Sequence, residues 1–385
     1  MPEDWEYGGF GLYIHWPFCQ AKCPYCDFNS HVAARIDQTA WQAAYLSEID
    51  RVGAETSGRI LRSVFFGGGT PSMMDPDVVD AILTKVRATW SCANDIEVTL
   101  EANPTSVEAG RFAGYRDAGV NRVSMGIQAL NDPDLKALGR LHTATEAMAA
   151  FDVARSVFDR VSFDLIYARQ GQSLDAWQAE LGQALSMAID HLSLYQLTIE
   201  DGTAFGDRYA AGKLRGLPDD DLAADMYAVT QEMCDAAGLP GYEVSNHAAA
   251  GLESRHNLIY WRYGDYAGVG PGAHGRLTLG GERLATEAPL APGAWLAQVR
   301  NGGNGDLQRV PLTMDEQQAE FLLMGLRLSE GISLDRFGLS HDERFINKIN
   351  ALIEISMLSM DDDHLRLTPQ GRPVLNAVLR QLLDV

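Results

Sequence analysis

Three cysteines near the start of the chain give the clearest chemical signal in the sequence. Cys19, Cys23 and Cys26 lie within eight residues, separated by spacings of four and three. A short loop with this spacing can wrap its thiolates around one corner of a cubic iron–sulfur cluster, which normally takes four protein thiolates. No fourth cysteine lies nearby, and Phe28 stands two residues after Cys26. The spacing therefore predicts a [4Fe–4S] cluster with one iron open to an outside ligand.

Two other interpretations of these cysteines stay open on the residues alone. A zinc ion completed by His15 or His31 is one, although structural zinc usually pairs C-x-x-C with a distant second pair. Three unrelated buried thiols are the other. The remaining cysteines, Cys92 and Cys234, stand alone, which is unlike the disulfide framework of a secreted protein. A reducing compartment makes metal binding the better interpretation.

Glycines and carboxylates form a second group of candidates. The segment Gly-Gly-Gly-Thr-Pro begins at Gly67, and glycine can offer bare backbone groups to a polar ligand. A tight turn without a ligand is the alternative. Glu101 and Asp164 end or interrupt apolar strands, where charges are rarely buried unless they are paired. They suit ribose hydroxyls or an ammonium group, or else a salt bridge to Arg122 or Arg140.

A histidine with aromatic neighbours forms the third candidate. The segment His-Asn-Leu-Ile-Tyr-Trp begins at His256, and Tyr263 and Tyr266 follow it. Histidine is a common iron ligand in heme proteins, and aromatic rings can provide a flat apolar surface for a porphyrin. Aromatic clusters are more often core or interface packing. The residues alone leave both hypotheses open.

The elements that must position these residues form a repeating β–α pattern. The β-like runs are rich in Val, Ile, Leu, Phe or Tyr, and helical periodicity at residues 38–51 and 77–87 lies between them. Such units predict a parallel sheet, and the candidate residues gather at the carboxyl ends of its strands, as in barrel-type α/β proteins. Six strands indicate an incomplete barrel. The runs are 10–16, 63–66, 96–101, 122–127, 161–167 and 191–199.

The pattern changes after about residue 200. A helix is expected at 219–237, an aromatic and glycine-rich stretch at 256–279, and a linker at 301–305. Helices at 316–328 and 343–355, a hairpin and a last helix predict a smaller, mainly helical, winged-helix-like domain with an acidic wing. We therefore expect three domains: 1–200, the partial barrel with the cluster site; 201–300, an extension with the histidine motif; and 301–385, the winged-helix-like domain.

Composition limits the classes of partner. The chain is 46% hydrophobic and 22% charged, as in a soluble globular protein with a normal core. A net charge of −21 argues against non-specific binding of nucleic acid and against anionic lipid. No apolar run of about 18 residues predicts a membrane span, and the acidic start lacks the features of a signal peptide. A cytoplasmic location is expected.

The cysteine motif, with an aromatic residue before its last cysteine, resembles the radical S-adenosylmethionine (SAM) superfamily, whose fold is a partial TIM-like barrel. Further motifs resemble the oxygen-independent coproporphyrinogen III oxidase family of porphyrin biosynthesis. They are Tyr-Ile-His-Trp-Pro-Phe-Cys at 13–19, Gly-Gly-Gly-Thr-Pro at 67–71, Glu-Ala-Asn-Pro at 101–104, Gly-Ile-Gln at 126–128 and Asp-Leu-Ile-Tyr at 164–167.

Within that family the chain is most similar to the HemW-type heme chaperones. The oxidases carry an additional cysteine where Phe28 stands, and an N-terminal extension that is absent before Cys19. The segment at 256–261 fits the H-N-x-x-Y-W motif associated with heme in the chaperone branch. The resemblance implies a cluster on the three cysteines, with SAM on the fourth iron. It places SAM beside Tyr13, Tyr25, Gly68, Gly69, Thr70, Glu101, Gln128, Arg140 and Asp164, and heme beside His256, Asn257, Tyr260 and Trp261.

Three functions are compatible with the resemblance. The first is a heme chaperone that binds heme and passes it to an acceptor protein, with an electron donor for the cluster. The second is a radical SAM enzyme that oxidatively decarboxylates coproporphyrinogen III. The third is a radical enzyme that acts on another substrate. Phe28 and the His256 motif favour the first, and whether the chain performs radical chemistry stays open.

Overall fold

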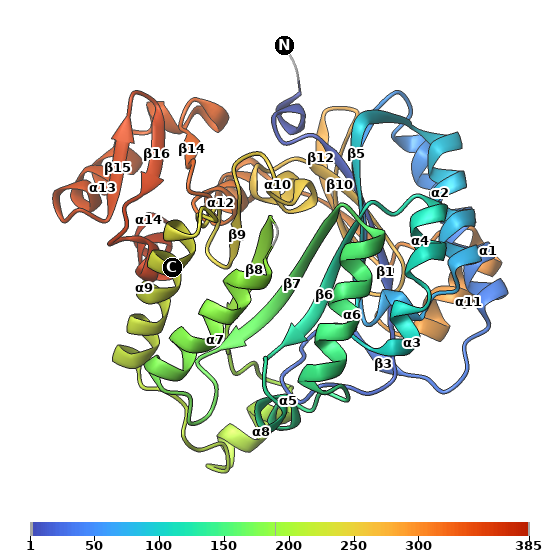
Figure 1. Ribbon diagram of the computed structural model, residues 1–385. Helices are drawn as coiled ribbons and strands as arrows, with labels where there is room; N and C mark the ends of the chain where they lie inside the picture. Colours follow the sequence, from blue (N-terminus) through green and yellow to red (C-terminus); the bar gives the residue numbers. More distant parts are fainter. Residues whose placement is uncertain (1–2, 189, 384–385) are drawn as a thin grey trace.

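The computed structural model describes residues 3–188 and 190–383, and its main feature is one large curved sheet (Figure 1). Six parallel strands form the centre of this sheet in the order of the chain, each hydrogen-bonded to the next. Their residues are mostly buried, which explains the near-continuous apolar runs of the sequence. The central strands are β1 (Phe10–Trp16), β4 (Ile60–Gly68), β5 (Ser91–Ala102), β6 (Arg122–Gln128), β7 (Arg160–Tyr167) and β8 (His191–Gln196).

Helices cover the outer face of the sheet between these strands. Their starts are fixed by local signals: Asp37 caps α1 by accepting from the Ala40 amide, and Thr143 and Glu146 form a capping box at α6. The crossover helices are α1 (Gln38–Glu55), α2 (Pro76–Thr89), α4 (Phe112–Ala118), α6 (Ala144–Val157) and α7 (Leu174–Met187). The repeated β–α units and the incomplete six-stranded barrel predicted from the sequence are confirmed.

The sheet extends beyond the six strands at both edges. Strand β10 (Asp265–Val269) pairs with β1 in parallel, and β11 (His274–Leu279), β12 (Glu282–Glu287) and β13 (Gln308–Pro311) continue from it in antiparallel order. At the other edge β9 (Asn246–Ala248) pairs antiparallel with β8. The aromatic and glycine-rich stretch after residue 256 therefore belongs to the large sheet. Residues 303–307 connect α11 to β13, which is still part of that sheet.

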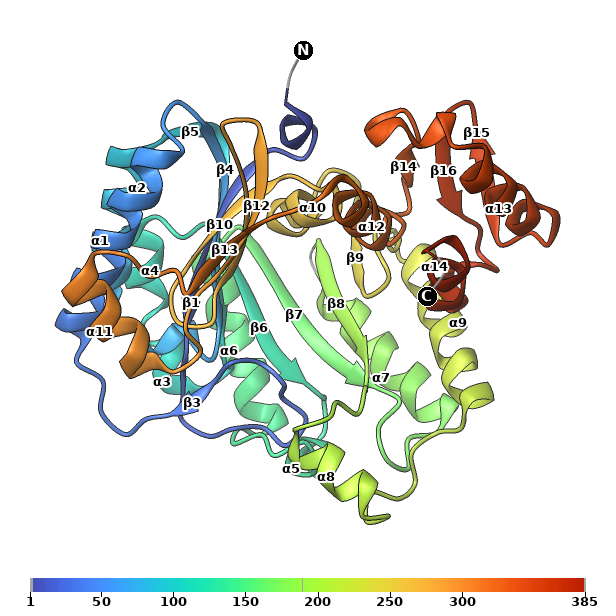
Figure 2. The same cartoon turned by 180° about the vertical axis from the view of Figure 1, so that it is seen from behind.

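Shorter elements close the two ends of the barrel. At the carboxyl ends of the strands lie β2 (Phe18–Cys19), β3 (His31–Val32), α5 (Asp132–Ala137) and α8 (Ala204–Ala210) (Figure 1). At the opposite, amino end lies α10 (Arg255–Trp261), which contacts β1, β4 and β10 (Figure 2). Further helices on the outside are α3 (Ser106–Ala109), α9 (Asp220–Ala236) and α11 (Pro292–Gly302).

The C-terminal part has its own hydrophobic core. The helices α12 (Met314–Gly325), α13 (Glu343–Glu354) and α14 (Leu375–Leu383) pack with a small antiparallel sheet of β14 (Ile332–Ser333), β16 (His364–Leu367) and β15 (Leu358–Asp361). The predicted smaller helical domain with a hairpin is confirmed. Tyr263 of the barrel side belongs to the same core, so the two parts share a packed contact. None of the described helices combines the length and hydrophobicity that a membrane span needs.

Candidate functional site

The cysteine loop and the carboxyl ends of strands β4 to β7 enclose an open cavity of about 160 Å³. All three motif cysteines line it, together with most of the residues predicted to surround SAM. Those lining residues are Tyr25, Gly68, Gly69, Thr70, Glu101, Gln128, Arg140 and Asp164. The structure thus gathers onto one cavity wall residues that are spread over 146 positions of the sequence, from 19 to 164. Their assignment to SAM stays a prediction.

The cysteine loop is held by backbone contacts at both ends. Strands β2 and β3 pair in parallel, and the His31 amide donates to the Pro17 carbonyl at 2.7 Å. The side-chain amide of Asn29 donates to the carbonyl oxygens of Pro271 and Leu290, both at 2.9 Å. The loop is therefore anchored to a segment more than 240 residues away in sequence, so its thiols keep a fixed position over the cavity.

Each cysteine sulfur has a polar neighbour. Thr70 Oγ1 lies 3.4 Å from Cys19 Sγ, Arg140 Nη1 lies 3.5 Å from Cys23 Sγ, and Ser30 Oγ lies 3.9 Å from the third sulfur. Such donors stabilise a thiolate, the form that binds metal. Burial raises the pKa of the Cys19 thiol, so without metal this thiol is protonated at neutral pH and metal binding releases its proton.

The arrangement of donors suits a cluster better than a single ion. Among residues 3–188 and 190–383, no group of three or more His, Cys, Asp or Glu side chains is arranged to hold one metal ion. A zinc ion needs four ligands at about 2.0–2.3 Å from one centre. The three thiols, carried by one loop, all line the cavity. In a cubic cluster each sulfur binds a different iron, so the three sulfurs need not converge on one centre.

The glycine-rich loop after β4 packs tightly beneath the cysteine loop. The Gly69 amide donates to the Trp16 carbonyl at 2.7 Å, and the Thr70 amide donates to the Phe18 carbonyl at 2.8 Å. Gly68 has φ of +109°, and a Cβ there would lie 2.6 Å from the His15 ring. The glycines are thus needed for close packing between β1 and β4, and this brings the loop to the cavity wall.

Two half-buried carboxyl groups lie on the cavity wall. Glu101 is on β5 and Asp164 is on β7, and the side chain of Ser124 donates to Asp164 at 3.4 Å. Burial, together with repulsion from Asp164, raises the pKa of Glu101 to about 8, and burial raises the pKa of Asp164 to about 6. Perturbed carboxyls that face a cavity favour a polar or cationic ligand, since such a ligand would restore the interactions lost with water.

Arg140 places a positive charge beside the cysteine loop. Besides the Cys23 sulfur, its guanidinium donates to Asn103 Oδ1 and to the Gly126 carbonyl oxygen, each at 2.7 Å. None of these three acceptors is a carboxylate, so the positive charge is available to an anionic group in the cavity. A carboxylate ligand or a negatively charged cluster would satisfy it.

Gln128 is the backbone outlier of the cavity. It ends β6 next to a register shift, and it adopts φ of +74°, which is uncommon for a residue other than glycine. Its buried Oε1 has no hydrogen-bond partner within the described protein. Strained backbone and an unpaired buried acceptor are typical of ligand-binding positions.

The remaining predicted residues lie outside the cavity wall. Tyr13 is on β1 behind it, and its hydroxyl is hydrogen-bonded to His15 Nδ1 at 3.0 Å. The four residues of the H-N-x-x-Y-W motif lie in and around α10, at the amino end of the barrel, so they do not share the cavity with the cysteines. These residues are His256, Asn257, Tyr260 and Trp261.

Sequence reasoning left out two cavity residues that matter. Asn103 accepts from Arg140 and donates to Thr70 at 3.2 Å, and it lies two positions after Glu101. Ser124 bridges towards Asp164 from the neighbouring strand. Both are neutral residues whose importance comes from alternation along a strand, because every second side chain faces the cavity. That period, applied to strands β5 and β6, is the signal that would have found them.

Two family models match parts of this chain. A family model described as the radical SAM superfamily matches residues 13–181, and one described as the HemN C-terminal domain matches residues 312–374. The structure is similar to that of the Escherichia coli coproporphyrinogen III oxidase HemN, with a TM-score of 0.80 and 21% identity, over 97% of this chain and 90% of that one. At this identity the similarity shows a shared fold.

Curated relatives match nearly the whole chain. The bovine (Bos taurus) radical S-adenosyl methionine domain-containing protein 1, mitochondrial, is 40% identical over 97% of this chain and 87% of its own length. The heme chaperone HemW of E. coli is 37% identical over 97% of both chains. The heme chaperone HemW of Haemophilus influenzae is 37% identical, again over 97% of both.

Proposed function

The chain belongs to the radical SAM superfamily, in its HemN-like group that includes the HemW proteins, and from this premise we propose that it is a heme chaperone. It binds heme and passes it to an acceptor protein, and it carries a [4Fe–4S] cluster and SAM. The relatives that are named heme chaperones, matched over almost their full length, support this function.

The observation that carries the proposal is the side chain at position 28. Phe28 lines the cavity, and 60% of the residue is exposed. At this position the resemblance gives the oxidases a further cysteine. An exposed aromatic ring at that position supports a protein that handles a flat apolar ligand rather than one that decarboxylates coproporphyrinogen III. This supports the chaperone over the oxidase.

The three cysteines are proposed to hold the cluster, and the other cavity residues are proposed to hold SAM. Arg140 suits the carboxylate of SAM because its guanidinium has only neutral acceptors and a thiol. The half-buried Glu101 and Asp164, whose carboxyl pKa values are raised, suit the ammonium group and the ribose hydroxyls. When bound, the cluster and SAM supply one-electron chemistry. A cytoplasmic location, a heme acceptor and an electron donor stay predictions.

Anaerobic reconstitution tests the function directly. We expect iron and sulfide contents of about four each per chain for one [4Fe–4S] cluster. We also expect binding of added hemin near one per chain, and transfer of that heme to an apo-hemoprotein such as apomyoglobin. The same preparation is assayed with coproporphyrinogen III, SAM and a reductant. Efficient decarboxylation without hemin binding would contradict the chaperone proposal.

The variant Cys23→Ala tests the cluster ligands. Cys23 is only partly buried, so its removal is expected to leave the fold intact, while the broad visible absorbance of the cluster is lost. Cys92→Ala is the matched control, because Cys92 lies outside the cavity lining and its removal should leave the absorbance unchanged. A fully retained cluster spectrum in Cys23→Ala would overturn the ligand assignment.

A further inference from the structure

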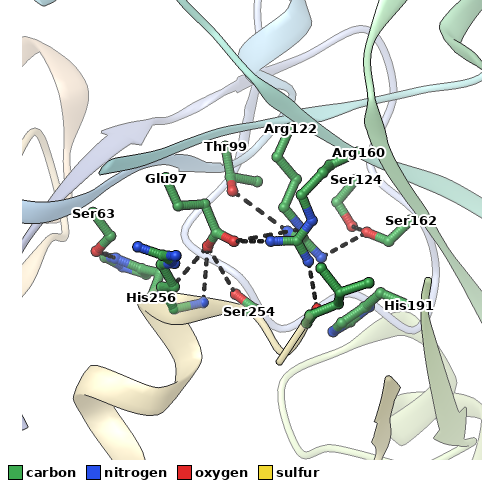
Figure 3. Close-up of polar contacts among 12 residues, drawn as sticks. Ser63, Glu97, Thr99, Arg122, Ser124, Arg160, Ser162, His191, Ser254 and His256 are labelled. Atoms are coloured by element: carbon green, nitrogen blue, oxygen red, sulfur yellow. Dashed lines mark hydrogen bonds and ion pairs between the residues drawn. The ribbon is translucent and has the colours of Figure 1, made fainter. Parts of the chain in front are cut away.

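The imidazole of His256 is fully engaged inside the protein. Its side chain is buried, with 2% of the residue exposed, and it stacks on the Phe65 ring at a centroid distance of 4.9 Å. Its Nδ1 is hydrogen-bonded to Ser63 Oγ at 2.8 Å (Figure 3), and its Nε2 is hydrogen-bonded to the Tyr260 hydroxyl at 2.7 Å. Iron ligation needs a ring nitrogen with a free lone pair and an open approach. Neither nitrogen offers this, so His256 as arranged does not fit a heme ligand.

The barrel is built to receive this ring. Strand β1 carries Gly11 opposite it, and a Cβ at Gly11 would lie 2.9 Å from Ser63 Oγ and 3.4 Å from His256 Nδ1. The contact therefore depends on residues of β1, β4 and α10 together. Burial lowers the pKa of His256 to about 3, so the ring is neutral throughout the physiological range.

We infer that the H-N-x-x-Y-W motif is a buried joint that connects the C-terminal domain with the cysteine loop and the cofactor cavity, and that His256 is a positioning residue rather than the ligand of heme iron. This role of the motif deepens the proposed function. Only the statement about heme iron rests on the chaperone proposal. Three sets of contacts carry the inference.

The first set of contacts leads from the motif to the cysteine loop. The His256 ring stacks on the Tyr13 ring, with centroids 6.2 Å apart and an angle of 26° between planes. The Tyr13 hydroxyl is hydrogen-bonded to His15 Nδ1 at 3.0 Å, and His15 Nε2 is bonded to the backbone oxygen of Asn29 at 2.9 Å. Asn29 belongs to the loop that carries the cysteines. Two side chains thus separate His256 from that loop.

The second set begins at Glu97, a buried carboxylate of β5. Its Oε1 accepts from the backbone amides of Arg255 and His256 at 3.0 and 3.4 Å, so it holds the first turn of α10 (Figure 3). Its Oε2 pairs with Arg160 at 3.0 Å and lies 4.0 Å from Arg122. A buried carboxylate is stable here because both its oxygens are paired.

The same network continues through the barrel interior to the cofactor cavity. Arg122 Nη2 donates to Ser162 Oγ at 2.8 Å, and the hydroxyl of Ser162 bonds to that of Ser124 at 3.0 Å (Figure 3). Ser124 then donates to Asp164, which lines the cavity. These contacts form a continuous polar path from the start of α10 to a residue predicted to bind SAM.

The third set leads outward to the C-terminal domain. The guanidinium of Arg327, just after α12, lies over the Trp261 ring at 4.6 Å, and it pairs with the buried Glu243 at 3.1 Å. Asn257 donates to the Tyr242 hydroxyl at 3.2 Å. Every residue that defines the motif therefore has a contact within the protein, and together they join three parts of the chain.

The test compares His256→Ala with Ser63→Ala, which removes a partner of the ring without touching the motif. Both reconstituted full-length variants are studied by electron paramagnetic resonance of the reduced cluster and by resonance Raman spectroscopy of bound hemin. The joint predicts that both variants shift the cluster signal and lower cluster iron at least twofold. It also predicts that both retain the heme ligation of the wild-type chain. In His256→Asn the side-chain amide can still form a hydrogen bond with Ser63, so this variant should keep more of the wild-type cluster signal than His256→Ala does.

Other results separate the two proposals. Loss of the heme iron's histidine signature in His256→Ala but not in Ser63→Ala would overturn the inference and leave the chaperone function standing. Unchanged cluster spectra in both variants would overturn the joint as well. Absence of hemin binding by the wild-type chain would instead contradict the proposed function, while the cluster spectra still test the joint. If His256→Ala does not fold, Ser63→Ala and His256→Asn provide the same comparison. The surface variant His364→Ala serves as the control for removal of an exposed histidine.

Discussion

At the scale of single residues, Arg140 is the most informative side chain of the cavity. Its acceptors are a thiol, an amide oxygen and a backbone carbonyl, so this half-buried positive charge lacks a carboxylate partner in this set. We predict that Arg140→Gln weakens SAM binding about 10- to 100-fold, because a hydrogen bond to a charged group is worth about 1.5–3 kcal/mol. Isothermal titration calorimetry with SAM, on the reconstituted wild-type chain and the reconstituted variant, measures this loss of affinity. Arg116→Gln, on the exposed surface, should bind as the wild type does, and equal affinity in both variants would contradict the role of Arg140.

Glu101 is expected to make stability depend on pH. Its pKa is raised from 4.5 in the unfolded chain to about 8 in the folded chain, chiefly by burial. Between these values the folded state binds more protons at Glu101 than the unfolded state, so the contribution of this group to the free energy of unfolding falls as pH rises from about 4.5 to about 8. Asp164 has the same sign over the lower part of that window, up to its pKa of about 6.

Urea unfolding of the cofactor-free chain at pH 5 and pH 8 measures this effect. Buried histidines such as His256, whose pKa is lowered from 6.5 to about 3, act with the opposite sign below about pH 6.5, so the contribution of Glu101 is measured as a difference between variants. From pH 5 to pH 8 the wild type should lose stability relative to Glu101→Gln, by an amount on the order of a few kcal/mol. Glu232→Gln, an exposed position on α9, should respond to pH as the wild type does. The prediction is wrong if Glu101→Gln and the wild type respond equally to pH.

The cavity residues differ in how far the sequence could predict them. The thiols were recognisable because their spacing is local and their chemistry is rare. Asn103 and Ser124 were missed because neutral polar residues carry no such signal, and only their position beside Glu101 and Asp164 gives them importance. His256 was the hardest, since its type and neighbours suit both a heme ligand and a buried ring. Burial and hydrogen bonds, which the sequence does not contain, distinguish these alternatives.

At the scale of elements, the loop after β4 depends on close packing at one glycine. We predict that Gly68→Ala destabilises the chain by about 1–3 kcal/mol through its positive φ, and also lowers cluster content, because the added Cβ would displace the His15 ring. Gly58→Ala is a matched control, since Gly58 has φ of +84° with no atom within 4 Å of the added Cβ.

The iron content and the urea midpoint of both glycine variants separate the effect of backbone strain from the loss of the cluster. Both should lose stability from backbone strain, and only Gly68→Ala should lose the cluster. Equal cluster contents would show that contact between this loop and β1 is not needed for the metal site.

Elements inside the parallel sheet were predictable, and those at its edge were not. Strands such as β6 and β7 are continuous apolar runs with helical segments between them, which is a local signal. Strand β10 pairs with β1 across more than 250 residues, and its sequence Asp-Tyr-Ala-Gly-Val gives no comparable run. The predicted last strand, 191–199, is longer than the observed β8 because β8 ends at Gln196.

At the scale of the whole molecule, Arg327 connects the C-terminal part to the barrel. We predict that Arg327→Ala destabilises this contact by about 1–3 kcal/mol, because the buried Glu243 loses its cationic partner. Hydrogen exchange should become faster in α10 and α12, while the crossover helices of the barrel stay protected. Arg366→Ala removes a surface ion pair with Asp361, and it should change neither the stability of this contact nor the hydrogen exchange of α10 and α12. Unchanged exchange in α10 would contradict the connection.

The pairing of β1 with β10 has a consequence for how the protein is made. The cysteine loop is translated before its anchors at Pro271 and Leu290, which follow Asn29 by 242 and 261 residues. Contacts so distant in sequence form late in folding. The nascent loop therefore stays without its final support until residues 271–290 have been synthesised. A cluster held by these thiols would gain its full protein surroundings only after that point.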